Sequence, residues 1–235
     1  ISASLPSDMI FHLDAINNNG RTGTWYDEVN DRAVTIDSGC DVSTPGKAVT
    51  QSGSMYVNNY NPFGSGYTGD FTISWTGNIV LPTNETNNKR DALSFVGSTR
   101  NVSSGDYGTG RWTLALKHGS SDSPQYKFFC NDGTSTTIAS TTDATSGQCV
   151  VTVIRRSGIL YVYRDSTLIF SDTFTKSLGI TSGTPILSIN GYNALAHGCE
   201  PVGWEFYSMF ICDRAITSDE LTLAVTYQKN RYSIS

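Results

Sequence analysis

Apolar and polar side chains alternate with a period of two along much of this chain, which is typical of β-strands with one buried face. Phe71, Ile73 and Trp75 alternate with threonine and serine, and residues 112–117 repeat the pattern with tryptophan and leucine. Residues 148–154, 159–163 and 168–171 are three further strand-like runs, separated by short turn sequences that contain Ser, Gly and Asp. These three runs predict an antiparallel meander.

The last thirty-odd residues predict a strand followed by a helix. Residues 204–212 alternate, and Trp204, Phe206, Phe210 and Cys212 share one parity, which we interpret as one face of a strand. Thr217 and Glu220 have the spacing of a capping box, in which each side chain bonds the backbone N–H of the other residue. Leu221, Ala224, Val225 and Gln228 then follow at helical spacing. A helix starting after residue 217 and ending near residue 232 is therefore predicted.

These elements predict an all-β fold of two packed antiparallel sheets with one short C-terminal helix, because the strand runs do not alternate with helices. We expect residues 1–235 to form a single domain, since sandwiches of this length are common. The first residue is isoleucine rather than methionine, so we expect the chain to be a processed product or part of a longer protein.

Short motifs near both ends resemble a known family. Leu13-Asp14-Ala15 precedes Trp25-Tyr26-Asp27, while Gly203-Trp204-Glu205 precedes Asp213-Arg214-Ala215. In this order they resemble the LamG-like jelly rolls of the concanavalin A-like lectin and glucanase superfamily. Residues 70–75 are similar to the first long strand of that family, and residues 150–165 to its central hairpin. The resemblance implies a jelly-roll sandwich.

Composition narrows the classes of partner. The formal net charge is −5 and the pI is about 5.1, which argues against nucleic-acid binding because phosphate contacts require clustered Lys and Arg. No apolar run approaches the roughly twenty residues needed to span a bilayer, so we predict no membrane insertion. A low charged fraction of 16% with abundant Ser, Thr and Gly suits an extracellular or virion surface.

The five cysteines do not have the spacing of a zinc site, because no C-x-x-C pair occurs. Cys149 and Cys212 lie in strand-like runs and are predicted to be buried. Cys130 and Cys199 fall in predicted loops, where the sequence leaves a disulfide open.

The residues of a glycosidase are not recognisable in the sequence. Glucanases of the superfamily carry Glu-x-Asp-x-Glu on one strand, whereas Asp27, Glu28 and Asp31 have a different spacing and fall in a predicted turn. Glu205 is the single carboxylate of its strand and is interpreted as structural. No Gly-x-Ser-x-Gly motif is present. We therefore predict no catalytic residues and no firmly assigned cofactor.

The resemblance implies calcium as a candidate ion, because LamG and pentraxin relatives often bind it at the rim of the sandwich. No Asp-x-Asp-x-Asp loop is present, and Asp and Asn are common in turns of any β protein. Calcium is kept as an open alternative without assigned ligands.

Carbohydrate recognition combines aromatic rings that stack on sugars with amide, carboxylate or guanidinium groups that bond hydroxyls. Three predicted loops, residues 58–69, 97–110 and 190–203, contain both kinds of side chain. The predicted ligand-binding residues are Tyr60, Asn61, Tyr67, Arg100, Asp106, Tyr107, Tyr192, Asn193 and His197.

The function predicted from these features is a non-catalytic module that binds a glycan or a cell-surface receptor, as in a viral or bacterial attachment protein. One alternative is a glycoside hydrolase or polysaccharide lyase whose acid and base come from separate strands. Another is a structural or assembly domain of a fibre or virion, which would form a homo-oligomer.

Overall fold

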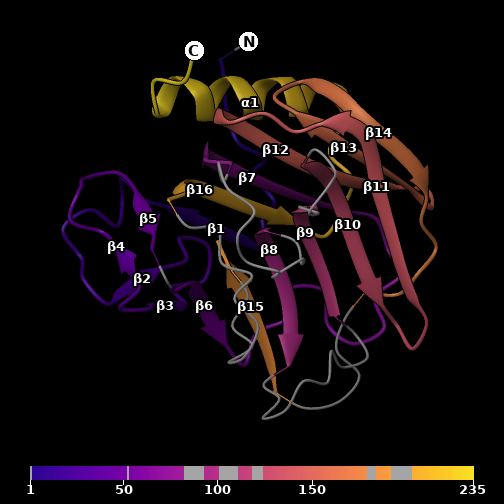
Figure 1. Cartoon of the computed structure of the whole chain (residues 1–235), viewed down its shortest axis with the longest axis horizontal. Helices are drawn as coiled ribbons and strands as arrows, with labels where there is room; N and C mark the ends of the chain where they lie inside the picture. Colours follow the sequence, from indigo (N-terminus) through magenta and orange to yellow (C-terminus); the bar gives the residue numbers. More distant parts are fainter. Residues whose placement is uncertain are drawn as a thin grey trace.

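The computed structural model describes residues 2–51, 53–81, 93–100, 111–117, 124–178, 184–191 and 203–235. In this part of the chain, two antiparallel sheets pack face to face, and the helix α1 (Ser218–Arg231) lies across the outer face of one of them (Figure 1). The predicted all-β sandwich with one C-terminal helix is therefore confirmed. Both ends of the chain lie on the side of the molecule where α1 packs.

The first sheet, sheet A, has eight strands among the described residues. Seven of them are hydrogen-bonded side by side in the order β14 (Thr167–Thr173), β13 (Ile159–Arg164), β12 (Gly147–Arg156), β7 (Phe71–Ile79), β16 (Glu205–Cys212), β5 (Ala48–Thr50) and β4 (Cys40–Asp41). The eighth strand, β1 (Phe11–Asp14), pairs with the later part of β16. The antiparallel pairings of β12 with β13 and of β13 with β14 confirm the predicted meander.

Sheet B also has eight strands in the described segments. Their order is β11 (Ser135–Asp143), β10 (Gln125–Asn131), β9 (Arg111–Lys117), β8 (Leu93–Arg100), β15 (Pro185–Ile189), β6 (Met55–Asn58), β3 (Ala33–Ile36) and β2 (Thr24–Tyr26). The inner faces of the two sheets enclose the main core, which is rich in aromatic rings. Trp75 and Trp204 of one layer each approach Phe95 of the other, with ring centroids 4.8 Å apart.

A second, smaller core lies between sheet A and the helix. Leu221, Ala224 and Val225 of α1 pack there on Val150 and Ile154 of β12, and all five are buried. The predicted helical spacing of these residues is thus confirmed. Because the helix covers this face, the central strands of sheet A are buried on both sides.

Because β7 is buried on both sides, two hydroxyl residues on its outer face bond groups of the protein instead of water. Thr72 and Ser74 are 0% and 1% exposed, although the alternating pattern suggests a solvated face. The Thr72 hydroxyl accepts a hydrogen bond from the Ile216 N–H and donates to the Arg214 carbonyl. Ser74 donates to Gln228, the polar residue on the buried face of the helix. These hydroxyls join the helix and the segment before it to the sheet.

Strand β16 contains a bulge that the sequence analysis missed. Its pairing with β7 shifts register between Phe206 and Ser208. Trp204 and Phe206 therefore lie in the main core, whereas Phe210 and Cys212 lie in the smaller core under the helix. The interpretation that these four residues share one face is wrong, because the extra residue of a bulge reverses the alternation beyond it.

The position of Cys130 also differs from the prediction. It lies within β10 and is fully buried, and its thiol donates a hydrogen bond to the carbonyl of Ser177 at 3.3 Å. The placement of Cys130 in a loop was wrong because β10 continues to Asn131 and the chain bends only at residues 132–134. Cys149 and Cys212 are buried as predicted, and Cys199 lies outside the described residues.

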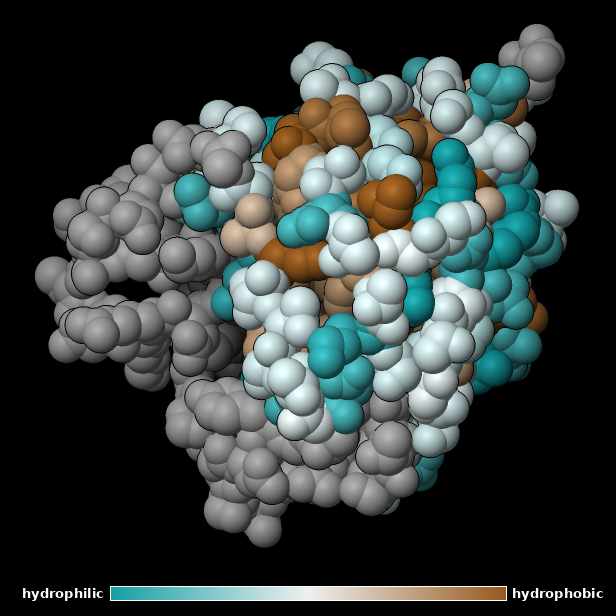
Figure 2. Space-filling model, turned by 90° about the vertical axis from the view of Figure 1, so that its right-hand side faces the viewer, coloured by the Kyte–Doolittle hydropathy of each residue, from teal (hydrophilic) through white to brown (hydrophobic). Residues whose placement is uncertain are grey.

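The free edge of sheet A brings some apolar side chains to the surface. Ile159 on β13 and Leu168 on β14 are 38% and 47% exposed. Figure 2 views the side of the molecule where β14 and β11 lie, and it shows apolar residues interspersed with hydrophilic and intermediate ones. Among the described residues, no helix has the length and apolar character needed to cross a membrane.

The predicted capping box is present at the start of α1. The Glu220 N–H donates to the Thr217 hydroxyl at 3.2 Å, and the Thr217 N–H donates to the Glu220 carboxylate at 2.7 Å. The same carboxylate accepts two hydrogen bonds from Arg214, at 2.6 and 2.9 Å, and Arg214 also binds Asp8. The hydrogen bonds from Arg214 lower the pKa of Glu220 from 4.5 to about 2.

We expect Thr217→Ala to lower the free energy of unfolding by about 1 kcal/mol, because the Glu220 N–H loses its acceptor. Thr226→Ala is the matched control on the exposed side of the same helix, where alanine should cost nothing because it is the better helix former. Urea unfolding of both variants measures the difference. Equal losses in the two variants would contradict a capping role.

The depressed pKa of Glu220 predicts a stability term that is fully present above the unfolded pKa of 4.5 and is lost as the pH falls through about 2. We therefore expect urea midpoints to fall between about pH 5 and pH 2, and to fall less in Glu220→Gln. Asp219→Asn is the control, because Asp219 lies in the same turn without an arginine partner among the described residues. A pH dependence identical in all three proteins would refute the assignment.

Candidate functional site

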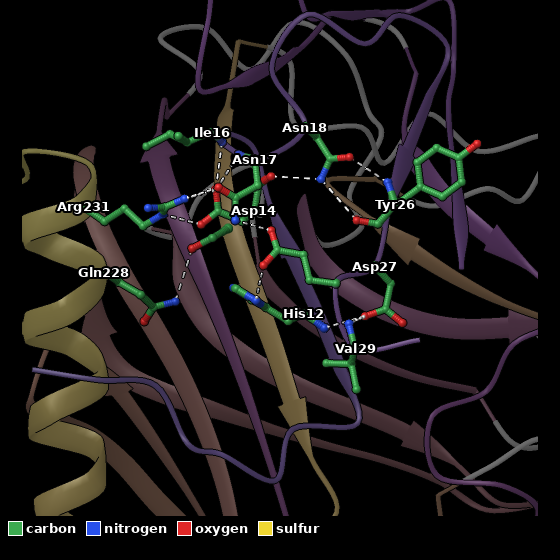
Figure 3. A network of polar contacts seen from close by, with 12 residues as sticks. His12, Asp14, Ile16, Asn17, Asn18, Tyr26, Asp27, Val29, Gln228 and Arg231 are labelled. Carbon is green, nitrogen blue, oxygen red and sulfur yellow. Dashed lines mark hydrogen bonds and ion pairs between the residues drawn. The ribbon is translucent and has the colours of Figure 1, made fainter. Parts of the chain in front are cut away.

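A network of polar side chains joins the start of the chain to the end of α1 (Figure 3). Asp14, the last residue of β1, is 1% exposed, and its carboxylate accepts hydrogen bonds from Arg231 Nε and Nη2 at 2.5 and 3.2 Å. The N–H groups of Ile16 and Asn17 donate to the same carboxylate. Arg231 Nη2 also donates to Asn17 Oδ1 at 2.6 Å. The guanidinium is therefore held in one orientation by two residues of the N-terminal turn.

The same network continues to the acidic residues that follow β2. Asn17 Nδ2 donates to Glu28 at 2.6 Å, and His12 Nδ1 lies 3.2 Å from the other oxygen of Glu28. Burial raises the pKa of Glu28, but the hydrogen bonds from His12 and Asn17 outweigh it, so the net shift is downward. Asp27 is fully buried and accepts from the His12 N–H and from Arg32 Nη1, each at 2.9 Å. These acids organise the N-terminal turn.

Next to Arg231 lies an open depression of about 530 Å³, which we call the α1 depression. One wall is formed by the last two turns of the helix and the other by the N-terminal segment. The residues that line it are Ser2, Ala3, Tyr227, Asn230 and Arg231. Its lining thus combines an aromatic ring, an amide and a guanidinium on a fixed backbone.

A second polar cluster lies at the start of β16. Glu205 binds Lys47 Nζ at 2.5 Å, accepts from the Tyr207 hydroxyl at 2.5 Å and lies 3.5 Å from Asn78 Nδ2. Burial raises the pKa of Glu205, but the hydrogen bonds from Lys47 and Tyr207 outweigh it, so the pKa is lowered. Gln148 donates to the Tyr207 hydroxyl at 2.8 Å. Glu205 is therefore ionised and ion-paired, which is typical of a residue with a structural role.

The structure describes the side chains of three of the predicted ligand-binding residues, all in the loop before β7. The Tyr60 ring stacks on Phe11 at 5.8 Å and lies 4.3 Å from the Arg32 guanidinium, and its hydroxyl donates to the Ile10 carbonyl at 3.3 Å. Burial raises the pKa of Tyr60 to about 12. Asn61 bonds the backbone of its own turn, donating to the Gly64 carbonyl at 2.7 Å.

Tyr67 belongs to a different part of the same loop and has its own contacts. Its ring stacks on Phe63 at 5.3 Å, and its hydroxyl lies 2.5 and 2.8 Å from the carbonyls of Asp70 and Asp213. The hydroxyls of Tyr60 and Tyr67 are therefore engaged in separate internal contacts. Whether either residue contacts a ligand stays a prediction.

The remaining predicted residues cannot be compared in the same way. Arg100 is the last residue of β8, opposite Pro185 of β15. The others, Asp106, Tyr107, Tyr192, Asn193 and His197, lie outside the described residues. In the described segments no group of three or more His, Cys, Asp or Glu side chains could hold a metal ion. The calcium alternative stays a prediction.

The sequence analysis did not select the residues of the α1 depression. Tyr227, Asn230 and Arg231 have the spacing i, i+3 and i+4, which places them on one side of a helix. That spacing was visible in the sequence. The opposite wall was not, because the contact between the chain start and the helix end depends on the pairing of β1 with β16.

Comparisons with known proteins give structural likeness without sequence likeness. No family model matches the chain, and no curated protein matches its sequence. Among solved structures, the binding domain of Paraclostridial Mosquitocidal Protein 1 aligns with a TM-score of 0.65 at 16% identity, over 95% of this chain and 53% of that one. The botulinum neurotoxin serotype D binding domain aligns with a TM-score of 0.63 at 13% identity, over 94% and 51%.

An enzyme shares the fold as well. Trypanosoma rangeli sialidase in complex with sialic acid aligns with a TM-score of 0.62 at 13% identity, over 97% of this chain. This chain spans only 34% of the sialidase and about half of the toxin binding domains. At these identities the likeness shows the fold alone, a β-sandwich of two antiparallel sheets.

We expect Arg231→Ala to lower the free energy of unfolding by about 2 kcal/mol, because the buried Asp14 carboxylate would lose its cation. Lys229→Ala removes a cation from the same helical turn without breaking an ion pair in the described part of the chain, and it should cost under about 0.5 kcal/mol. Chemical denaturation at neutral pH compares the two variants. Similar losses would mean that the Asp14 pair does not stabilise the fold.

Proposed function

We propose that this chain is a non-catalytic, LamG-like module that binds a glycan or a cell-surface receptor. The observation that carries the proposal is its structural likeness, over 94–95% of its length, to binding domains of two toxins. One further structure of the botulinum neurotoxin D domain is titled a receptor binding domain, and it aligns with a TM-score of 0.63. Because fold alone does not determine function, the side-chain chemistry must agree with it.

Two of the described acidic residues favour binding over catalysis. A glycosidase needs one carboxylic acid with a raised pKa as its proton donor, beside a second carboxylate. Glu205 and Glu28, one acid from each of the two polar clusters, both have lowered pKa values and are paired with Lys47 and His12. Neither has the protonation state of a general acid at neutral pH.

The likeness to the sialidase does not favour the enzyme alternative. The matched part is about a third of that chain, so an active site elsewhere in the sialidase would have no counterpart in this protein. A hydrolase or lyase with residues from separate strands remains the alternative function. An assembly domain of a fibre or virion is the other.

The acidic, weakly charged composition fits a module exposed outside the cell or on a virion, within a viral or bacterial attachment protein. Its partners in this proposal are glycans or cell-surface receptors, and residues 1–235 act as a single domain. Rim residues in the loops predicted from the sequence, including Tyr60 and Tyr67, remain candidate contacts.

The test combines a glycan array with assays for polysaccharide cleavage. We expect saturable binding to at least one glycan and no release of reducing sugar or unsaturated product. Glu205→Gln serves as the control and should change neither result, because Glu205 has a structural role in this proposal. Product that is released by the parent and lost in Glu205→Gln would establish the enzyme alternative. Absence of binding, together with a homo-oligomer in sedimentation, would favour the assembly domain.

A further inference from the structure

The α1 depression has the dimensions of a small-molecule site. Its volume of about 530 Å³ lies within the range of about 300–1,000 Å³ that is usual for ligand pockets. Tyr227, Asn230 and Arg231 contribute from one side of the helix, and Ser2 and Ala3 contribute from the facing segment. The depression is therefore bounded by two segments that are far apart in the sequence.

Hydrogen-bonding capacity is unused at this place. Within the described residues, the side chains of Tyr227 and Asn230 make no hydrogen bond, in contrast to the hydroxyls of Tyr60 and Tyr67. Arg231 uses Nε and Nη2 to bind Asp14 and Asn17, and nothing in the described part of the chain accepts from Nη1. A hydroxyl, an amide and a pair of guanidinium N–H groups are thus available to a ligand.

The charge of the site indicates a neutral ligand. The Arg231 guanidinium is already paired with the buried Asp14 carboxylate, so it offers donors without an unbalanced charge. The C-terminal end of a helix carries a partial negative charge, which disfavours an anion further. Neutral hydroxyl groups, which both donate and accept, match the three side chains best.

The site is also preorganised. Asp14 is fixed by two backbone N–H donors and by the pairing of β1 with β16, and it orients the guanidinium together with Asn17. Since the arginine loses little freedom when a ligand arrives, binding at this place carries a small ordering cost. Asp14 is in this sense a positioning residue for Arg231.

From these observations we infer that the α1 depression is a binding site for a neutral saccharide, an inference that rests on the proposed glycan-binding function. The Tyr227 ring packs on a C–H face of the sugar. The Asn230 amide and Arg231 Nη1 bond its hydroxyl groups. The bound sugar lies between the helix end and the N-terminal segment.

The test follows amide chemical shifts of the ¹⁵N-labelled chain during titration with neutral monosaccharides and disaccharides, alongside the glycan array. We expect shifts at Ser2, Ala3 and residues 227–231. Tyr227→Ala should weaken binding roughly five- to tenfold, and Asn230→Ala roughly threefold or more. Tyr227→Phe keeps the ring and should lose less than Tyr227→Ala.

Matched controls are Tyr161→Ala, a half-buried tyrosine of β13, and Asn58→Ala, an exposed asparagine at the end of β6. Both should bind as the parent does. If Tyr227→Ala fails to fold, the exposed Asn230 still tests the site. A parent that binds glycans while both depression variants bind equally well would overturn the inference and leave the proposed function intact. A preference for acidic glycans would overturn the neutral class. A parent that binds no glycan would overturn the inference and leave only the receptor-binding form of the proposed function.

Discussion

Burial of the central strands of sheet A on both faces is the constraint on which the rest of the molecule depends. The main core covers the inner side of these strands and α1 covers their outer side, so a polar group there is costly to bury unless it has a partner within the protein. Thr72, Ser74 and Gln228 meet this need between β7 and the helix. These hydrogen bonds help to fix the position of the helix on the sheet, and with it the position of the two helix ends. The ion pair of Arg214 with Glu220 lies at the start of the helix, and the ion pair of Arg231 with Asp14 lies at its end.

The N-terminal turn matters for the structure because its residues bind the end of α1. Because β1 pairs with β16 and the helix follows β16, the first and last segments of the chain meet over one face of the sheet. The Asp14–Arg231 ion pair joins them, and the wall of the α1 depression is a result of that contact. The proposed saccharide site thus depends on side chains that also stabilise the fold. The β-sandwich positions the two segments, and the Asp14–Arg231 pair positions the polar side chains of the proposed site.

Local patterns predicted the strands well, because the alternation of apolar and polar residues indicates which side chains of a strand are buried. Phe71, Ile73 and Trp75 point into the main core as their spacing implied, and Thr217 and Glu220 cap the helix. What could not be predicted depends on contacts between distant segments. No pattern within β7 says that a helix covers Ser74, and no pattern near residue 14 says that Arg231 lies beside it. Of the nine predicted ligand-binding residues, the three with described side chains show internal contacts, whose effect on ligand binding is untested.

The bulge in β16 lets one strand serve two cores. Phe206 faces the sandwich, whereas Phe210, an even number of positions later, faces the helix. Opposite the bulge, Gly77 of β7 allows a close approach, since a Cβ there would lie 2.0 Å from the Glu205 carbonyl oxygen. Insertion or deletion of a single amino acid in this strand would exchange the two sets of side chains between the interior layers. A change of chain length is therefore tolerated better in the connections than in this strand, because a connection can change without repacking the interior.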